Sequence, residues 1–145
     1  MKVICTRCGC TDVSCEAMVN PNSKEFKNYT DESFLYGWCE NCKTGVILSD
    51  TDEVQVEIQQ KFDLFVKDNG KEPHYANCRI VWKDTNDYYD VKIQLSGDTG
   101  KDDDIFFYCH SLNGLKSLAT FGGEDFIVTE INSFEEIVIV CNNEN

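Results

Sequence analysis

The cysteines are the residues whose type and spacing point most directly to chemistry. Four of them form two Cys-x-x-Cys pairs, Cys5 with Cys8 and Cys39 with Cys42. Each pair can present two thiolates to one cation, and two pairs complete the tetrahedron that a structural zinc ion favours. The spacing therefore predicts one structural Zn²⁺ that organises residues 1–48.

The other cysteines bear on the ligand choice and on the redox environment. The chain holds nine cysteines, and five of them lie outside the two pairs. Cys10 leaves a second ligand choice open beside Cys8, although a two-residue gap is the better-attested spacing. Cys15 is expected to be a small buried residue. The odd count and the short apolar run before Cys5 argue against a disulfide framework and a signal peptide, so a cytoplasmic protein is expected.

The first third of the chain resembles the zinc-ribbon group, in which a metal ion joins two β-hairpins through knuckles of the form C-x2-C-(G). Gly9 matches that form after Cys8, whereas Lys43 follows Cys42 and makes the second knuckle a looser match. The resemblance implies a nucleic-acid contact, a protein docking module or a scaffold element, and the closed four-thiolate coordination predicts structural rather than catalytic zinc. Rubredoxin-like iron is the alternative metal, but rubredoxins usually carry proline in the second knuckle, where Glu40-Asn41 stands here.

The segments between and beyond the knuckles predict an α+β protein in three parts: the ribbon at 1–48, a linking helix at 49–72 and an α+β domain at 73–145. In the ribbon, strands are expected at 13–19 and 33–38, joined by an exposed loop at 20–32. Residues 50–69 show apolar residues at helical spacing, opened by Asp50 with Glu53 and closed by Asn69-Gly70. The alternation of Val54, Val56 and Ile58 leaves a strand as the alternative.

The last part predicts the order β-β-β-α-β-β in a small antiparallel sheet. Strands are expected at 78–83, 88–95, 105–109, 126–131 and 137–141, with a short helix that begins after Ser111 and ends at Gly122-Gly123. In the second strand, Tyr89, Val91, Ile93 and Leu95 share the face that should be buried, and Gln94 falls on the wet face.

Charge restricts the partners. The net charge is −13, of which residues 1–50 carry −2 and the remainder −11. Such an acidic body repels nucleic-acid phosphates and favours basic protein partners. No stretch approaches the roughly 20 apolar residues of a membrane span. The aromatic residues Tyr29, Phe34, Tyr36 and Trp38 are expected in the ribbon's hairpin core more than in a base-stacking platform.

Two further groups could do chemistry, and each has a simpler interpretation. Cys109 and His110 are adjacent, but neighbours on a strand point to opposite faces, so a core cysteine is favoured over a thiolate–imidazole pair. Asp98 and Asp102-Asp103-Asp104 form an acidic loop that lacks the ligand order of a calcium-binding EF-hand. No catalytic set can be identified, so the protein is expected not to be an enzyme.

The sequence thus predicts a zinc-binding interaction or regulatory protein whose acidic body docks a protein partner. One alternative is a nucleic-acid-binding accessory factor that uses the ribbon tip, and another is an acidic DNA mimic that occupies a nucleic-acid-binding protein. The combination of a ribbon with a compact α+β tail is also similar to that of uncharacterised proteins of bacteria and their mobile elements. That similarity rests on no motif after residue 48 and implies no activity.

Overall fold

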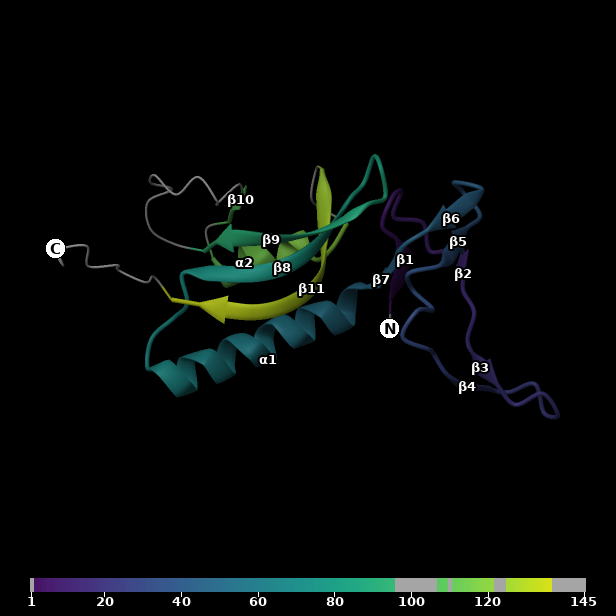
Figure 1. Ribbon diagram of the computed structural model, residues 1–145, viewed down its shortest axis with the longest axis horizontal. Coiled ribbons are helices and arrows are strands. Elements are labelled where there is room, and N and C mark those ends of the chain that lie inside the picture. Colours follow the sequence, from purple (N-terminus) through teal and green to yellow (C-terminus); the bar gives the residue numbers. More distant parts are fainter. Residues whose placement is uncertain (1, 96–106, 110, 122–124, 137–145) are drawn as a thin grey trace, which may run out of the picture.

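The computed structural model describes residues 2–95, 107–109, 111–121 and 125–136 (Figure 1). It is an α+β fold, as the sequence predicts. A small ribbon of short strands lies at one end of the molecule, and a sheet covered by two helices makes up the rest. Neither helix in these ranges is long and apolar enough to cross a membrane.

The ribbon is built from seven short strands: β1 (Val3–Cys5), β2 (Val13–Ser14), β3 (Met18–Val19), β4 (Phe26–Asn28), β5 (Gly37–Cys39), β6 (Thr44–Val46) and β7 (Leu48–Asp50). Strand β1 pairs with β7, and β5 lies between β2 and β6; all of these pairs are antiparallel. β3 and β4 form a separate two-stranded arm. The two Cys-x-x-Cys turns therefore follow β1 and join β5 to β6.

Three details of the ribbon differ from the prediction. The strand expected at 13–19 is interrupted at 15–17 and forms β2 and β3, which belong to different sheets. The expected strand at 33–38 is wrong at its start, because β5 begins only at Gly37. A local turn replaces it: the Ser33 hydroxyl accepts a hydrogen bond from the Thr30 N–H, and the Leu35 N–H donates to the Glu32 carbonyl. Such local bonds compete with strand pairing. The loop at 20–32 is exposed, as expected, but contains strand β4.

The predicted helix forms as α1 (Thr51–Asn69), and the strand alternative is wrong. Asp50 caps its start, because the carboxylate accepts a hydrogen bond of 3.1 Å from the Glu53 N–H. Gly70 ends it in the left-handed conformation at φ 72°, where its N–H bonds to the Val66 carbonyl. Val54 and Ile58 are buried on one face of the helix. The helical spacing of the apolar residues therefore predicts the structure correctly, and the strand-like alternation of Val54, Val56 and Ile58 does not.

The body sheet has four strands in the order β10-β9-β8-β11, formed by β8 (Tyr75–Trp82), β9 (Tyr88–Gln94), β10 (Phe107–Tyr108) and β11 (Phe126–Glu135). The pairs β8–β9 and β8–β11 are antiparallel, as predicted, but β10 runs parallel to β9, so the prediction of an antiparallel sheet is wrong for this pair. The helix α2 (Leu112–Leu118) begins at the cap Ser111, as predicted, and ends before Ala119. The glycines at 122–123 and the predicted strand at 137–141 lie outside the described residues.

The main core lies between one face of this sheet and the two helices. Its fully buried members include Ile58 of α1, Leu115 of α2 and Ile80, Ile93 and Val128 of the sheet. Burying such aliphatic side chains supplies about 1.5–3 kcal/mol each, which makes this layer the main source of stability.

The predicted pattern on β9 holds at only one of its ends. Ile93 and Leu95 are buried, but Tyr89 is half-exposed and Gln94 is buried. Within the part of the chain that the structure describes, β10 pairs only with Ile93 and Gln94, so β9 is there an edge strand at Tyr89 and an interior strand at Gln94. The position of the neighbouring strand β10, rather than the alternation of apolar and polar residues, determines which side chains of β9 are buried.

The ribbon packs against the end of the body sheet. Ile4 of β1 forms a buried cluster with Val81 of β8 and Ile127 of β11, and Ile47 and Phe121 pack around it. The Asn86 side-chain oxygen, in the turn between β8 and β9, accepts hydrogen bonds from the Thr6 hydroxyl at 3.0 Å and the Ile47 N–H at 3.3 Å. These contacts join the ribbon to the body. The predicted division of the chain into separate parts at residues 48 and 73 stays a prediction.

Asn86→Ala should destabilise the folded chain by about 2–3 kcal/mol. It removes the acceptor of two hydrogen bonds and places a Cβ-bearing residue without a polar side chain at φ 58°. Asn86→Gly is the matched control, because it keeps the left-handed backbone accessible and removes only the acceptor. Urea unfolding should give the order wild type, Asn86→Gly, Asn86→Ala. A glycine variant as stable as the wild type would show that these bonds do not hold the two parts together.

Candidate metal centre

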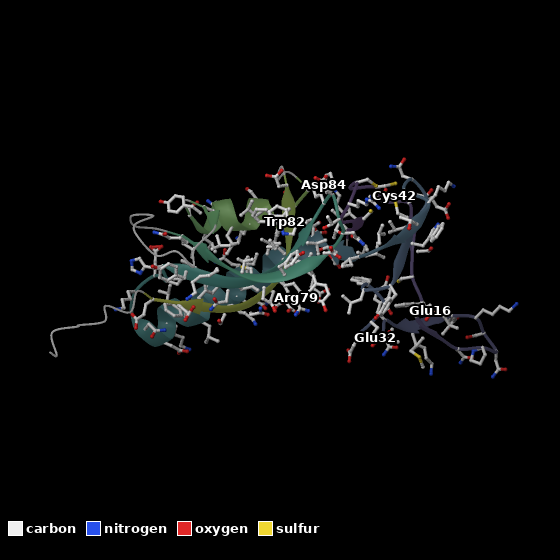
Figure 2. All side chains as sticks on the ribbon, turned by 45° about the horizontal axis from the view of Figure 1, so that its top comes forward. Glu16, Glu32, Cys42, Arg79, Trp82 and Asp84 are labelled. Atoms are coloured by element: carbon white, nitrogen blue, oxygen red, sulfur yellow. The ribbon has the colours of Figure 1, made fainter. Side chains whose placement is uncertain are left out.

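Four sulfurs from the two knuckles converge at the end of the ribbon opposite the β3–β4 arm. The Sγ atoms of Cys5, Cys8, Cys39 and Cys42 all lie within 4.8 Å of one another. The Cys8–Cys39 separation is 3.5 Å and the Cys5–Cys42 separation is 4.0 Å. A tetrahedral ion with metal–sulfur bonds of about 2.3 Å requires sulfurs about 3.8 Å apart. The tetrad can therefore hold one metal ion. In Figure 2, Cys42 marks this end, and Glu16 and Glu32 mark the arm.

The two knuckles have the same backbone. In the first, the Gly9 N–H donates to the Cys5 carbonyl at 2.8 Å, and in the second the Lys43 N–H donates to the Cys39 carbonyl, also at 2.8 Å. Gly9 has φ 79° and Lys43 has φ 56°, so both turns close through a left-handed residue. The second knuckle thus adopts the same turn as the first, with lysine in place of glycine. Its looser sequence match does not change the geometry.

Backbone N–H groups point at the sulfurs, as expected around thiolates. The Arg7 N–H lies 3.3 Å from the Cys5 sulfur, and the Cys42 N–H lies 3.4 Å from the Cys39 sulfur. Cys5 and Cys39 are fully buried, whereas Cys8 and Cys42 are half-buried. One ligand of each knuckle therefore belongs to the ribbon core and the other lies nearer the surface.

The protonation of the tetrad is uneven. Burial raises the pKa of Cys5, and the hydrogen bond to Cys8 together with burial raises the pKa of Cys42 to about 12. Burial also disfavours the Cys8 thiolate, but hydrogen bonds from the Cys10 backbone and the Asn41 side chain outweigh it and lower the pKa of Cys8 to about 7. Four adjacent thiolates repel one another, so a bound divalent cation is what would keep all of them ionised.

Local packing explains why the knuckles meet. A Cβ at Gly37 would lie 2.5 Å from the Leu48 side chain, so only glycine lets Leu48 pack against β5. Val46, Leu48, Cys5 and Cys39 then form the buried centre of the ribbon. In the first knuckle, Thr6 is fully buried, and its one hydroxyl hydrogen is shared between the Ile47 carbonyl at 2.7 Å and the Asn86 side-chain oxygen at 3.0 Å. No spacing rule in the sequence points to Gly37 or Thr6, because their partners lie far along the chain.

Neither neighbouring cysteine joins the tetrad. The Cys10 sulfur accepts a hydrogen bond from the Asp12 N–H at 3.3 Å, and Cys10 is not a member of the four-sulfur cluster. Cys15 packs, half-buried, against the ribbon core, in line with the prediction of a small apolar role. All eight cysteines in the described ranges are free thiols.

Cys109 lies in the body core, away from the metal centre. It is buried among the residues that α2 covers, and burial raises the pKa of its thiol to about 11. The neighbouring buried thiol of Cys78 has its pKa raised to about 12 by burial and by Cys109. Both are therefore protonated packing residues near neutral pH. His110 and the acidic residues Asp98 and Asp102 to Asp104 lie outside the described residues, so their interpretations stay predictions.

The aromatic residues of the ribbon are more exposed than predicted. Tyr36 is 73% exposed, and Tyr29 and Trp38 are 41% exposed; only Phe34 is half-buried among the ribbon core. The expectation that these four rings form a hairpin core is wrong for three of them. Only Trp38 lies on a strand, the three-residue β5, and the fully buried centre is occupied by Cys5, Cys39, Val46 and Leu48.

Comparison with known proteins finds no matching protein-family model, no matching curated protein and no matching solved structure. The function is therefore argued from this chain's own residues.

Proposed function

We propose that the protein is a zinc-binding, non-enzymatic interaction protein. One structural Zn²⁺, held by Cys5, Cys8, Cys39 and Cys42, organises the ribbon, and the acidic body docks a protein partner. The observation that carries the proposal is the convergence of four sulfurs within 4.8 Å on two equivalent knuckles. Four thiolates are a common ligand set of structural zinc and leave no open position for water. This closed coordination supports a structural rather than a catalytic role for the ion.

Zinc is proposed over iron, because the resemblance is to zinc ribbons and the rubredoxin proline is absent at Glu40-Asn41. The odd number of cysteines and the two Cys-x-x-Cys pairs favour metal ligands over a disulfide framework, which supports a reducing, cytoplasmic location. In such a compartment the four cysteines are available as ligands rather than as disulfides.

A protein partner is supported by the surface. The net charge of −13 favours association with basic partners. The ribbon also exposes large apolar side chains, namely Met18, Val19, Phe26, Tyr36 and Trp38. Three of them, Met18, Val19 and Phe26, lie on the paired strands β3 and β4, and exposed apolar groups that lie close together are typical of interaction sites.

One observation favours the nucleic-acid alternative. Tyr36 and Trp38 present exposed rings on a ribbon whose charge is only −2 over residues 1–50. Exposed aromatic rings can stack on single-stranded bases. The protein would then contact nucleic acid through the ribbon while its acidic body faces away. The DNA-mimic alternative stays a prediction.

Metal analysis of the natively purified chain tests the metal assignment. We expect one equivalent of zinc and little iron. A well-ordered but metal-free chain, or the four cysteines joined in disulfides, would refute it. Binding to single- and double-stranded oligonucleotides at 50 and 200 mM salt then separates the partner classes. A measurable affinity that collapses with salt would favour the nucleic-acid factor, and no binding at either salt would support the protein partner.

A further inference from the structure

We propose that a groove between the ribbon and the body binds a basic, arginine- or lysine-containing segment of a partner protein. This inference rests on the proposed function and names the surface and the chemistry of the partner. The groove has a volume of about 500 Å³. Three elements form its walls: the first turns of α1, the edge strand β11 with neighbouring Arg79 of β8, and the turn that precedes β5 in the ribbon. It thus lies where the two parts of the chain meet, and we call it the ribbon–body groove.

Carboxylates dominate the polar lining. Glu53 and Glu57 lie on one face of α1, because they are four residues apart, and Asp50, the N-cap of α1, lines the groove beside them. Asp31 of the ribbon and Glu130 of β11 line the groove from the other sides. Carboxylates that converge on one groove from separate elements repel one another and attract a cation.

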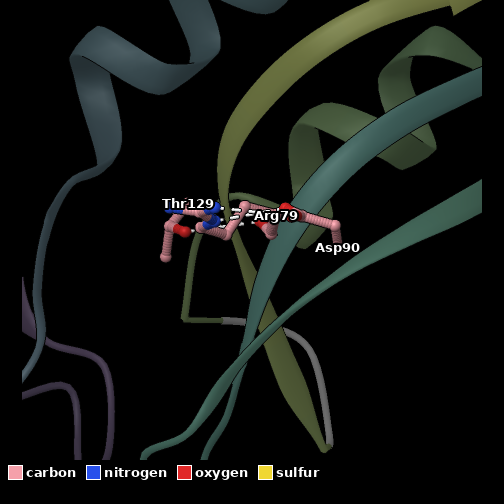
Figure 3. A network of polar contacts seen from close by, with 3 residues as sticks. All are labelled: Arg79, Asp90 and Thr129. Carbon is pink, nitrogen blue, oxygen red and sulfur yellow. Dashed lines mark hydrogen bonds and ion pairs between the residues drawn. The ribbon is translucent and has the colours of Figure 1, made fainter.

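The cations near these carboxylates offset only part of the negative charge of the groove: Asp90 and, to a lesser extent, Glu130 raise the pKa of Arg79, so Arg79 compensates part of the Glu130 charge. Arg79, which also lines it, is engaged by Asp90 through two hydrogen bonds, Nε–Oδ1 at 3.1 Å and Nη2–Oδ2 at 3.4 Å (Figure 3). Its guanidinium also lies 4.5 Å from the centre of the Tyr88 ring. Lys61 pairs with Glu57 at 3.4 Å, but both side chains are about 40% exposed, so the pair is weak. The groove keeps an excess of negative charge.

The ribbon wall supplies aromatic and aliphatic surface. Tyr29 and Phe34 line the groove with ring centres 4.9 Å apart, and Leu35 lies beside them. Val54 contributes from α1. Aromatic faces attract guanidinium and ammonium groups, and apolar surface packs against the methylene stems of arginine and lysine. The lining therefore suits a long cationic side chain better than an apolar one or a small inorganic cation.

An independent observation concerns Ser49 of β7. This residue lines the groove and is only 3% exposed, and its hydroxyl has no hydrogen-bond partner within the described residues. A buried hydroxyl without a partner costs about 1–3 kcal/mol. The Ser49 oxygen has less than 1 Å² of accessible surface, so a guanidinium N–H from a ligand would satisfy it only after the groove lining moves to expose it. The groove thus contains both the charge and an unused acceptor for such a group.

The bulge in β11 shapes the same place. The register with β8 shifts between Val128 and Glu130, and the Thr129 hydroxyl donates to the Arg79 carbonyl at 3.3 Å (Figure 3). A bulge re-aims side chains at a sheet edge and hinders further strand pairing. The partner is therefore expected to bind through side chains rather than by adding a strand to β11.

Fluorescence anisotropy with a labelled (Arg-Gly)₄ peptide, and (Glu-Gly)₄ as the negative control, tests the groove at 150 mM salt. The groove variant is Glu53→Gln/Glu57→Gln/Glu130→Gln. The control variant, Glu16→Gln/Asp68→Asn/Glu72→Gln, removes the same charge from exposed positions outside the groove. We expect the groove variant to weaken binding about tenfold or more, and the control variant less than about threefold.

Equal losses in the two variants would show binding to the general negative field and would overturn the groove assignment, as would absence of wild-type binding. Amide shifts on peptide addition give a second readout. They should concentrate at Asp31, Ser49, Glu53 and Glu130, and an even spread over the surface would contradict the proposal. If the zinc-loaded chain captures a protein partner from lysate equally well as wild type and as groove variant, the groove assignment fails while the proposed function stands. A metal-free ordered chain would instead refute the metal assignment of the proposed function alone.

Discussion

Replacing Cys39 with serine is expected to lower the metal content from one equivalent to near zero and to unfold the ribbon. The Cys39 sulfur is fully buried, lies 3.5 Å from the Cys8 sulfur and accepts the Cys42 N–H. Two of the four buried residues at the ribbon centre are themselves predicted ligands, Cys5 and Cys39. The ribbon therefore has little apolar core to hold it when the ion is lost. Structural zinc supplies about 10–16 kcal/mol in zinc-finger peptides, far more than this core can replace.

Metal analysis and amide hydrogen exchange measure this outcome. Exchange should accelerate in the ribbon, while α1 and the body sheet keep much of their protection because their core is separate. Cys109→Ala is the matched control: it removes a buried thiol from the body core and should leave the metal content unchanged. Full zinc retention in Cys39→Ser would refute the ligand assignment. Loss of zinc in Cys109→Ala would implicate the second half of the chain.

Gly9→Ala is expected to destabilise the chain by about 2–4 kcal/mol, from two separable causes. The first is the backbone: φ is 79°, and a Cβ in the left-handed region costs about 1–2 kcal/mol. The second is a clash, because a Cβ at Gly9 would lie 2.7 Å from the Phe121 ring. That ring packs in the ribbon–body cluster with Lys83 Nζ 3.8 Å from its centre, so it cannot yield freely. Overpacking of this kind costs about 1–3 kcal/mol.

Gly70→Ala separates the two causes. Gly70 has nearly the same backbone, at φ 72°, but a Cβ there would meet nothing within 4 Å. Gly70→Ala should therefore lower the free energy of unfolding by the backbone contribution alone, about 1–2 kcal/mol. Denaturant unfolding of both variants measures the difference, and metal affinity should fall only in Gly9→Ala, since Gly9 closes the first knuckle. If the two variants were equally stable, the contact between the first knuckle and Phe121 would not contribute to the free energy of unfolding.

The features that the sequence predicted well depend on residues close together in the chain. The helix at 51–69 follows from its apolar period and from two local caps, the Asp50 carboxylate and the left-handed Gly70. The cap at Ser111 is local in the same way. The tetrad is predictable because each Cys-x-x-Cys pair folds its own turn, and two turns that each present two thiolates can share one ion.

Other features were wrong or invisible because they depend on which segments become neighbours. Tyr89 is half-exposed and Gln94 buried because β10 pairs in parallel with only the last residues of β9. Tyr36 and Trp38 are exposed because the short ribbon strands have one small core, which the cysteines occupy. Residue type alone does not tell which of several apolar side chains receives the limited buried space.

The sequence by itself determined the α+β class, the long helix and the four cysteines that can hold one metal ion, since these follow from periodicity, capping and spacing within short segments. Only the tertiary structure decided how the ribbon sits on the body, through Thr6 with Asn86 and Gly9 against Phe121. The same docking creates the ribbon–body groove and gathers Asp31, Glu53 and Glu130 around it. These groups lie up to about 100 residues apart, and their meeting depends on the packing of whole elements rather than on any local pattern.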